Sequence, residues 1–586
     1  MNEFPKAMLF KVAFSLLSSL LLFLCLVDLG FLAWFSLLPL LFSLHKSTLR
    51  QSLLYTFLCG LTYFMGITYW VARIFIRPWV VLSLYLTVGF LFFGVVTHFV
   101  LSKVSFPYLR ILIVSGAWVL VEFGRSFTAL AFPIGLLGDS QYSFLPLMQL
   151  SKWTGIWGVS LLVALFNMAI FETIVGLVKS IGDYKQPTAE INGSVNNNSV
   201  NNNSTSNNHT VNHPVYRPIR NSILLPFRYP AVVGVVILIV IISGIPVLNG
   251  NLHRVIKNKN LKEIKLSIVQ PNIPLGEKYI HGSGVLIPEP YSSDKYFMDG
   301  TELVIFPESI LWGWVDEEEN VEFKQWAKET LSKESLYLLI GQVVPVEDPS
   351  SYKKDLYKKA RESEETEEVG PTEHEATEHE TKERGRFYNS VLFYDPYMNL
   401  IGQYNEIHPV PFTQYIPYPN VLKILSFIDY TVVDIIPGND YTPFYFPGKG
   451  KIGINICFES TIPRISRNFR KNGAQVIIII SDQASCFDTR APWYSFNINA
   501  RTRAIENGCY VVQCANTGIS GIISPAGEVI ASSQLLSKEV LYGSIFLMPG
   551  KTFYSKFGDL VMYVYWGVTF VLGCCYLCRP GSKKFF

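Results

Sequence analysis

Charged residues are scarce in this sequence. Only 16% of its 586 residues are Asp, Glu, Lys or Arg, whereas 49% are hydrophobic and 14% are aromatic. A chain this apolar is not an ordinary soluble enzyme, so the composition predicts a membrane protein. The formal net charge of +3 is too small to indicate nucleic acid as a partner.

Several motifs that define other enzyme classes are missing. The sequence has no Gly-Xaa-Ser-Xaa-Gly elbow, no Walker loop and, in its polar part, no Cys-Xaa-Xaa-Cys pair. His374 and His379 resemble a zinc-protease pair but are one residue too far apart to share a helical face. The run Gly448-Lys-Gly450-Lys-Ile-Gly453 matches a dinucleotide-binding pattern, yet it precedes a strand and therefore predicts a hairpin turn. We expect neither a metal nor a cofactor.

Long apolar runs are what the sequence does contain. Most reach the roughly 17 to 25 residues that span a bilayer, and together they predict about eight spans. The second and fifth are short, so we expect them to be re-entrant or extended at their ends. The runs are Met8–Val27, Phe31–Leu44, Leu53–Val71, Val80–Leu101, Ile111–Phe123, Val159–Val178, Ala231–Leu248 and Leu560–Cys578.

Basic residues in the short loops predict the orientation. With eight spans, nearly all of them fall on one side, and Arg73 and Arg77 are the main exceptions. By the positive-inside rule that side is cytoplasmic. The basic residues on it are Lys6, Lys11, Lys46, Arg50, Lys103, Arg110, Lys179, Lys185, Arg217, Arg220, Arg228, Lys583 and Lys584.

These runs divide the chain into three parts. Residues 1–248 form a seven-span membrane domain with an Asn/Ser-rich cytoplasmic linker at 191–213. Residues 249–558 form a polar extracytoplasmic domain with a charged insert at about 347–384, and 559–586 form a last span with a short basic tail.

The polar domain alternates short apolar strands with helical stretches, which predicts a single α/β domain. In such a domain the site usually lies at the carboxyl ends of strands. Glu308 and Cys457 both occupy such ends, in Val304-Ile-Phe-Pro-Glu308 and Ile454-Asn-Ile-Cys457. A thiolate is a strong nucleophile and a nearby carboxylate can take its proton. The pattern leaves two other readings open, in which Cys457 is an inert core residue and Glu308 is a helix cap.

Four ordered motifs together resemble the apolipoprotein N-acyltransferase family, a membrane branch of the nitrilase superfamily. The membrane part is similar too, in Ala131-Phe-Pro-Ile-Gly, Gln141, Pro146-Leu-Met-Gln149 and Gly155-Ile-Trp-Gly158. The motifs are Val269-Gln-Pro-Asn-Ile-Pro, Ile305-Phe-Pro-Glu308-Ser, Tyr404-Asn405 with His408-Pro-Val-Pro-Phe412, and Ile454-Asn-Ile-Cys457-Phe-Glu459.

The resemblance implies a nitrilase-like α-β-β-α sandwich inserted in a polytopic α-helical membrane domain, in the bacterial inner membrane. It also implies a Glu-Lys-Cys triad that moves an acyl chain from a phospholipid to the N-terminal amine of S-diacylglyceryl-cysteine lipoproteins. Glu308 would be the base and Cys457 the nucleophile that carries a thioester, with a backbone N–H after Cys457 at the oxyanion. The supporting residues would be Tyr404, His408, Phe458 and Glu459.

The chain departs from the family pattern at the third member of this triad. The family's lysine position is Glu406, and the glutamate of its Pro-Phe-Gly-Glu run is Gln414. A glutamate beside Glu308 removes a cation and should raise the pKa of the carboxyls and of the thiol. Another cation would then have to act in its place, for which Lys278 and Arg490 are candidates. Two alternatives remain: an impaired relative that binds lipoproteins or lipids, and a membrane-tethered carbon-nitrogen hydrolase.

Overall fold

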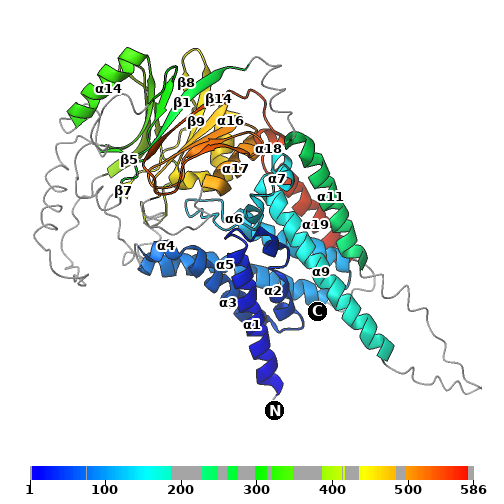
Figure 1. Cartoon of the computed structure of the whole chain (residues 1–586). Coiled ribbons are helices and arrows are strands. Elements are labelled where there is room, and N and C mark those ends of the chain that lie inside the picture. Colours follow the sequence, from blue (N-terminus) through cyan, green and yellow to red (C-terminus); the bar gives the residue numbers. More distant parts are fainter. Residues whose placement is uncertain are drawn as a thin grey trace, which may run out of the picture.

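A computed structural model places an α/β domain on one end of a bundle of long helices (Figure 1). The helices gather around the N-terminal and C-terminal parts of the chain, and the sheets come from the segment between them. The structure describes residues 3–73, 76–185, 227–248, 261–274, 297–312, 320–346, 386–411, 413–415, 434–483 and 496–578. The linker at 191–213 and the charged insert at 347–384 lie outside these residues.

The apolar runs form helices that fit a membrane protein. Among the described residues, six helices are long and apolar enough to cross a bilayer. Helix α3 (Leu49–Ile67), which is not one of these six, packs against both α1 and α5. The six are α1 (Glu3–Leu24), α5 (Ile76–Lys103), α6 (Pro107–Gly124), α9 (Ile156–Lys185), α11 (Arg228–Leu248) and α19 (Leu560–Leu577).

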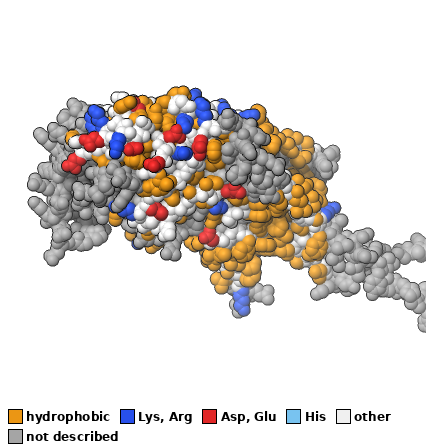
Figure 2. All heavy atoms as spheres, turned by 45° about the horizontal axis from the view of Figure 1, so that its top comes forward, with side chains coloured by type: hydrophobic (Ala, Val, Ile, Leu, Met, Phe, Trp, Pro, Cys, Tyr) orange, Lys and Arg blue, Asp and Glu red, His pale blue; other side chains and the backbone are white. Residues whose placement is uncertain are grey.

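The two short apolar runs form different structures. Phe31–Leu44 becomes the 3-10 helix η1 (Gly30–Trp34) followed by α2 (Leu38–Leu44), so it is not one continuous span. Ile111–Phe123 is extended at its start into α6, which begins at Pro107. The number of spans therefore stays a prediction. Figure 2 shows hydrophobic side chains covering the helical part, whereas charged side chains are scattered over the α/β domain.

Two mixed sheets stack face to face in the α/β domain. The first has the order β14-β1-β2-β4-β5-β6, with β3 and β7 on its margins, and the second has the order β13-β12-β11-β10-β9-β8. The strands of the first are β1 (Glu263–Gln270), β2 (Leu303–Ile305), β3 (Leu311–Trp312), β4 (Tyr337–Pro345), β5 (Arg386–Tyr394), β6 (Leu400–Asn405), β7 (Asp434–Ile435) and β14 (Glu539–Phe546). Those of the second are β8 (Phe444–Phe446), β9 (Gly450–Ile456), β10 (Val476–Ser481), β11 (Tyr510–Ala515), β12 (Gly521–Ile523) and β13 (Val529–Ser532).

Alternation along the strands of the first sheet separates two apolar layers. Because successive side chains point to opposite faces, Ile305 and Leu339 pack toward the second sheet, whereas Val304 and Leu338 pack toward α14 (Val321–Glu334). Helices α16 (Pro463–Lys471) and α17 (Phe496–Asn507) cover the second sheet. The order helix, sheet, sheet, helix confirms the expected sandwich.

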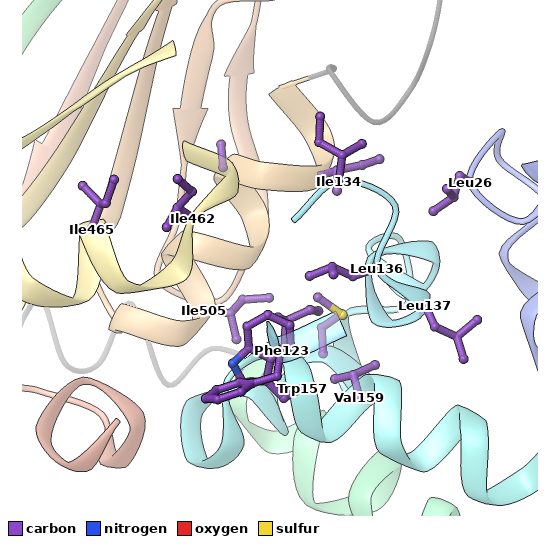
Figure 3. Close-up of a cluster of buried hydrophobic side chains, with 14 of the residues drawn as sticks. Leu26, Phe123, Ile134, Leu136, Leu137, Trp157, Val159, Ile462, Ile465 and Ile505 are labelled. Carbon is purple, nitrogen blue, oxygen red and sulfur yellow. The ribbon is translucent and has the colours of Figure 1, made fainter. Parts of the chain in front are cut away.

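Helices α16 and α17 also form the junction with the membrane helices. Figure 3 shows Ile505 of α17 beside Phe123 and Trp157 of the helical part. On the helical side of this junction, most of the residues belong to the loop between α6 and α9. This loop is the segment that resembles the family's membrane motif.

Buried polar bonds reinforce the same junction. The Ile156 N–H donates to Glu506 Oε1 at 2.8 Å, and Trp157 Nε1 donates to Asp559 Oδ1 at 3.1 Å. Arg467 pairs with the other oxygen of Asp559 at 2.8 Å. These bonds cross between segments far apart in the sequence, so they fix the α/β domain on the helices that carry it.

One smaller prediction is confirmed, and a buried cysteine is found in the core. Phe446 and Gly450 are paired in antiparallel register, so the glycine-rich run is the hairpin between β8 and β9 and not a nucleotide-binding loop. Cys514 is fully buried, with its sulfur 3.4 Å from the carbonyl oxygens of Val269 and Ile305 in the facing sheet, as a core cysteine should be.

Candidate active site

Strand ends from both sheets converge on one place. Glu308 follows β2 of the first sheet, and Cys457 directly follows β9 of the second. Asp482 directly follows β10, the neighbour of β9. The backbone N–H of Asp482 donates to Glu308 Oε2 at 2.8 Å, and the carbonyl oxygen of Asp482 lies 3.8 Å from Cys457 Sγ. The two residues chosen from their strand positions are therefore close in space.

Glu308 is held as a hydrogen-bond acceptor on both oxygens. Asn389 Nδ2 donates to Oε1 at 2.8 Å, opposite the Asp482 N–H on Oε2. The side chain is buried, with 6% of its surface exposed. No helix begins at Glu308, so the helix-cap reading fails. Two neutral donors hold this carboxyl group in place beside the thiol.

Gly341 of β4 lets the backbone of Glu308 approach closely. A Cβ atom at Gly341 would lie 2.5 Å from Glu308 Cα and 2.5 Å from the carbonyl oxygen of Pro307. Both are backbone atoms, which cannot move aside as a flexible side chain can. A glycine inside a strand commonly marks such an approach.

Gly341→Ala is expected to displace Glu308 and slow any reaction that depends on it. Overpacking of this kind costs roughly 1–3 kcal/mol of stability, which thermal unfolding in detergent would measure. Gly550→Ala is the matched control, because no atom lies within 4 Å of a Cβ placed there. Equal behaviour of the two variants would contradict the assigned role of Gly341.

Cys457 combines backbone strain with a partly accessible side chain. Its φ is +46°, a left-handed conformation that non-glycine residues seldom adopt and that is often found at functional sites. Burial raises the pKa of the thiol well above its ordinary range, and the charge of Glu308 adds to this effect. The thiol therefore needs a proton acceptor to react, and Glu308 is the carboxyl group beside it, since both residues contact the backbone of Asp482.

Glu406 lies beside Glu308, linked to it through one amide. Asn389 Nδ2 donates to Glu406 Oε2 at 3.0 Å while it also donates to Glu308. Gln414 Nε2 donates to the same Glu406 oxygen at 3.3 Å. Burial and the charges of Glu308 and Glu459 raise the pKa of Glu406 well above its usual range, in the direction expected from the sequence.

The two residues that depart from the family pattern, Glu406 and Gln414, thus contact each other. Where that pattern has a lysine and a glutamate, this chain has Glu406 and Gln414, so the hydrogen-bond acceptor is now at position 406 and the donor at 414. Lys278 and Arg490, the candidate replacement cations, lie outside the described residues. Within those residues no ion pair joins Glu406 to a lysine or arginine.

Glu459 ties the Glu406 segment to the Cys457 segment. It is fully buried in η8 (Cys457–Thr461) and accepts the Ile456 N–H at 2.7 Å. It also accepts the Ile407 N–H at 2.7 Å, the His408 N–H at 3.2 Å and the Tyr404 hydroxyl at 2.8 Å. Burial raises its pKa to about 7 against the effect of these donors. The carboxyl group organises the turn that presents the cysteine.

His408 and Phe458 connect the site to the membrane part. His408 Nε2 lies 3.0 Å from the Ala131 carbonyl oxygen, so the imidazole has a structural bond as expected. The ring of Phe458 stacks against His408 and lies 5.0 Å, between centroids, from Phe132. Tyr415 reaches the same loop through a bond to the Ala129 carbonyl oxygen at 2.6 Å. The residue after the nucleophile thus rests on a loop of the helical domain.

Sequence reasoning missed Asn389, Asp482, Gly341 and Phe132. Asn389 is a polar residue inside an otherwise apolar strand, and Gly341 is a glycine inside one, so both left a weak local signal. The strand β6, which leads to Glu406, was also missed, because it is a sheet edge with several exposed side chains.

The arrangement can perform nucleophilic acyl chemistry. It has a thiol, a carboxyl group able to take its proton, and buried neutral donors around them. Within the described residues, no group of three or more His, Cys, Asp or Glu could hold a metal ion.

Two family models match the chain. The model described as Carbon-nitrogen hydrolase matches residues 260–548, and the model described as Apolipoprotein N-acyltransferase N-terminal domain matches residues 18–169. The first match covers the α/β domain and the second covers most of the helical bundle.

Curated relatives align with most of the chain. Apolipoprotein N-acyltransferase of Geobacter metallireducens is 26% identical over 90% of this chain and 88% of its own length. The proteins of the same name from Thermotoga maritima and Chlorobaculum tepidum are 22% and 23% identical, over 91% and 92% of this chain and 87% and 91% of their own lengths. Among solved structures, Saccharomyces cerevisiae Nit3, of the nitrilase superfamily, is 18% identical with a TM-score of 0.32, over 49% of this chain and 90% of Nit3.

Proposed function

Since this chain belongs to the apolipoprotein N-acyltransferase family, we propose that it transfers an acyl chain from a phospholipid to the N-terminal amine of an S-diacylglyceryl-cysteine lipoprotein. The enzyme is an acyltransferase with a carbon-nitrogen hydrolase domain. The observation that carries the proposal is that Cys457 and Glu308, at the ends of strands in the two sheets, both contact the backbone of Asp482 and so lie side by side.

In the first half of the reaction, Cys457 becomes acylated. Glu308 takes the thiol proton as the sulfur attacks the ester carbonyl carbon of the phospholipid. The carbon–oxygen ester bond then breaks, a thioester remains on Cys457, and the lysophospholipid alkoxide leaves with the proton from Glu308.

In the second half, the lipoprotein amine attacks the thioester carbonyl carbon. Glu308 takes a proton from the amine nitrogen as the amide bond forms, and it returns that proton to the departing Cys457 sulfur. Protons balance over the two halves. The backbone N–H after Cys457 supplies one donor to the oxyanion in both steps.

The α/β domain would lie on the extracytoplasmic side of the membrane. The distribution of basic loop residues supports this side. Helix α1 also begins at the end of the bundle away from the α/β domain (Figure 1). Both lipid substrates would then enter the site sideways from the outer leaflet, past the loop that carries Ala131 and Phe132.

Glu406 favours a second candidate function. A buried carboxyl group where the family pattern has a lysine, together with a thiol whose pKa is raised, favours slow turnover. Such a protein would bind lipoproteins or lipids through the same site without efficient transfer.

Mass spectrometry of the intact full-length chain after incubation with a diacyl phospholipid would test the proposal. We expect one acyl group on Cys457 of the wild-type protein and none in Cys457→Ala. Cys509→Ala is the matched control, because Cys509 is fully buried away from Glu308 and should leave the adduct unchanged. Lipoprotein binding without an adduct would support the second candidate, and an adduct that persists in Cys457→Ala would contradict the mechanism.

A further inference from the structure

The two oxygens of Glu406 have different surroundings. Oε2 accepts hydrogen bonds from Asn389 Nδ2 at 3.0 Å and from Gln414 Nε2 at 3.3 Å. Oε1 is buried as well, but no described residue hydrogen-bonds to it. Leaving a buried carboxylate oxygen without a donor is costly. One side of this carboxyl group is therefore satisfied and the other is not.

Both amides that hold Oε2 are fixed in orientation. Gln414 Oε1 accepts the Val410 N–H at 2.5 Å, so its Nε2 must face Glu406. Asn389 Nδ2 faces two carboxyl groups at once, which is the placement that a donor requires. Because Oε2 already faces two N–H donors, a proton on Glu406 can only reside on Oε1.

Among the described residues, the charged groups that act most strongly on Glu406 oppose a negative charge there. Glu308 approaches from the end of β2, and Glu459 approaches from η8. Cys457 and Tyr404 are the other titratable groups close by, and both become negative when they ionise. These neighbours and its burial raise the pKa of Glu406 well above the usual range. Burial and these neighbours therefore favour the neutral form of this carboxyl group.

We propose that Glu406 is a neutral acid whose Oε1 hydroxyl donates a hydrogen bond to the carbonyl oxygen of the acyl group while Cys457 attacks it. The role rests on the proposed acyl-transfer function. A carboxylic acid that its surroundings keep protonated can stabilise a developing oxyanion as a donor without carrying charge. The proton stays on Glu406 throughout, and Glu308 alone exchanges protons with the thiol and the amine.

Substitution of Glu406 by glutamine and by methionine distinguishes the effect of a hydrogen-bond donor at this position from the effect of a charge. In Glu406→Gln, the amides of Asn389 and Gln414 force the new oxygen into the place of Oε2, so the new NH2 group occupies the place of Oε1. Glu406→Met has similar length and no donor. The measurement is the single-turnover rate of Cys457 acylation by phosphatidylethanolamine with a labelled acyl chain, using the full chain in detergent from pH 6 to pH 9.

The donor role predicts different losses for the two variants. Glu406→Met should be slower by about 10²–10³-fold, the usual effect of removing one oxyanion donor, and Glu406→Gln should lose no more than about 10-fold. The wild-type rate should fall at high pH as Glu406 ionises, and that fall should be absent in Glu406→Gln. A methionine variant as fast as the wild type, or a glutamine variant as slow as methionine, would overturn the proposal.

Alkylation of Cys457 by iodoacetamide at pH 7 tests the charge of Glu406 without any acyl substrate. If Glu406 is neutral, Glu406→Gln should change this rate by less than about two-fold. If Glu406 is an anion, Glu406→Gln removes a negative charge and lowers the pKa of the thiol, and a fall of one pKa unit speeds alkylation up to about tenfold. An increase of about tenfold would therefore contradict a neutral Glu406. A wild-type chain that forms no acyl adduct would instead defeat the proposed function and the donor role together, while the alkylation rates still decide the charge.

Discussion

Glu308→Gln is expected to slow the acylation of Cys457 by about 10²–10⁴-fold, the range that a positioned general base supplies. Glutamine has the same shape but cannot take the thiol proton. Partial burial and the charge of Glu308 raise the pKa of the thiol, so little thiolate forms unaided at neutral pH. Labelled acyl chain on Cys457, followed in single-turnover experiments with the full chain in detergent, gives the rate.

Glu302→Gln is the matched control for this prediction. Glu302 immediately precedes β2 but is partly exposed, and it pairs with Lys449 at 2.5 Å on the surface. Surface ion pairs contribute little to stability, so the control should retain its acylation rate. A Glu308→Gln rate within about tenfold of wild type would mean that another group deprotonates the thiol.

Glu459→Ala is expected to cause the largest loss of stability, about 3–5 kcal/mol, because it leaves three backbone N–H groups and the Tyr404 hydroxyl buried without their acceptor. The turn that holds Cys457 would also lose its tie to the Glu406 segment. Thermal unfolding of the purified chain should show a midpoint lower by roughly 10 °C. Acylation of Cys457 should also be lost at temperatures below this midpoint, where the variant is still folded.

Two companion variants make this second prediction specific. Glu459→Gln keeps one acceptor oxygen and should lose only about half as much stability. Glu334→Ala removes a glutamate whose side chain is 42% exposed at the end of α14, and it should leave the unfolding midpoint unchanged. If Glu459→Ala unfolds at the wild-type temperature, the hydrogen bonds to Glu459 do not stabilise the domain as described.

Much of the fold could be predicted because its signals are local. The apolar run that ends at Cys457 and the run that ends before Glu308 are strands, and each ends within three residues of the predicted catalytic side chain. The sandwich was predictable only through the family resemblance, which covers both domains. β6 escaped prediction because an edge strand with exposed side chains lacks a continuous apolar run.

The surroundings of the site residues could not be predicted in the same way. Asn389 lies 81 residues from Glu308 along the chain, and Asp482 lies 174 residues away, yet both donate to its oxygens. Gln414 could be recognised as a departure from the family pattern, but its contact with Glu406 required the folded loop.

The sequence by itself determined the membrane character, the order of strands and helices, and the two strand ends with a thiol and a carboxyl group. These properties depend on neighbours along the chain, through hydrophobic length and alternation. Only the tertiary structure decided which carboxyl groups share one amide, which oxygen of Glu406 lacks a partner, and that Phe458 rests on Phe132 of the helical domain. Those contacts arise where two sheets and a membrane loop meet, and there burial and like charge also raise the pKa of Glu406.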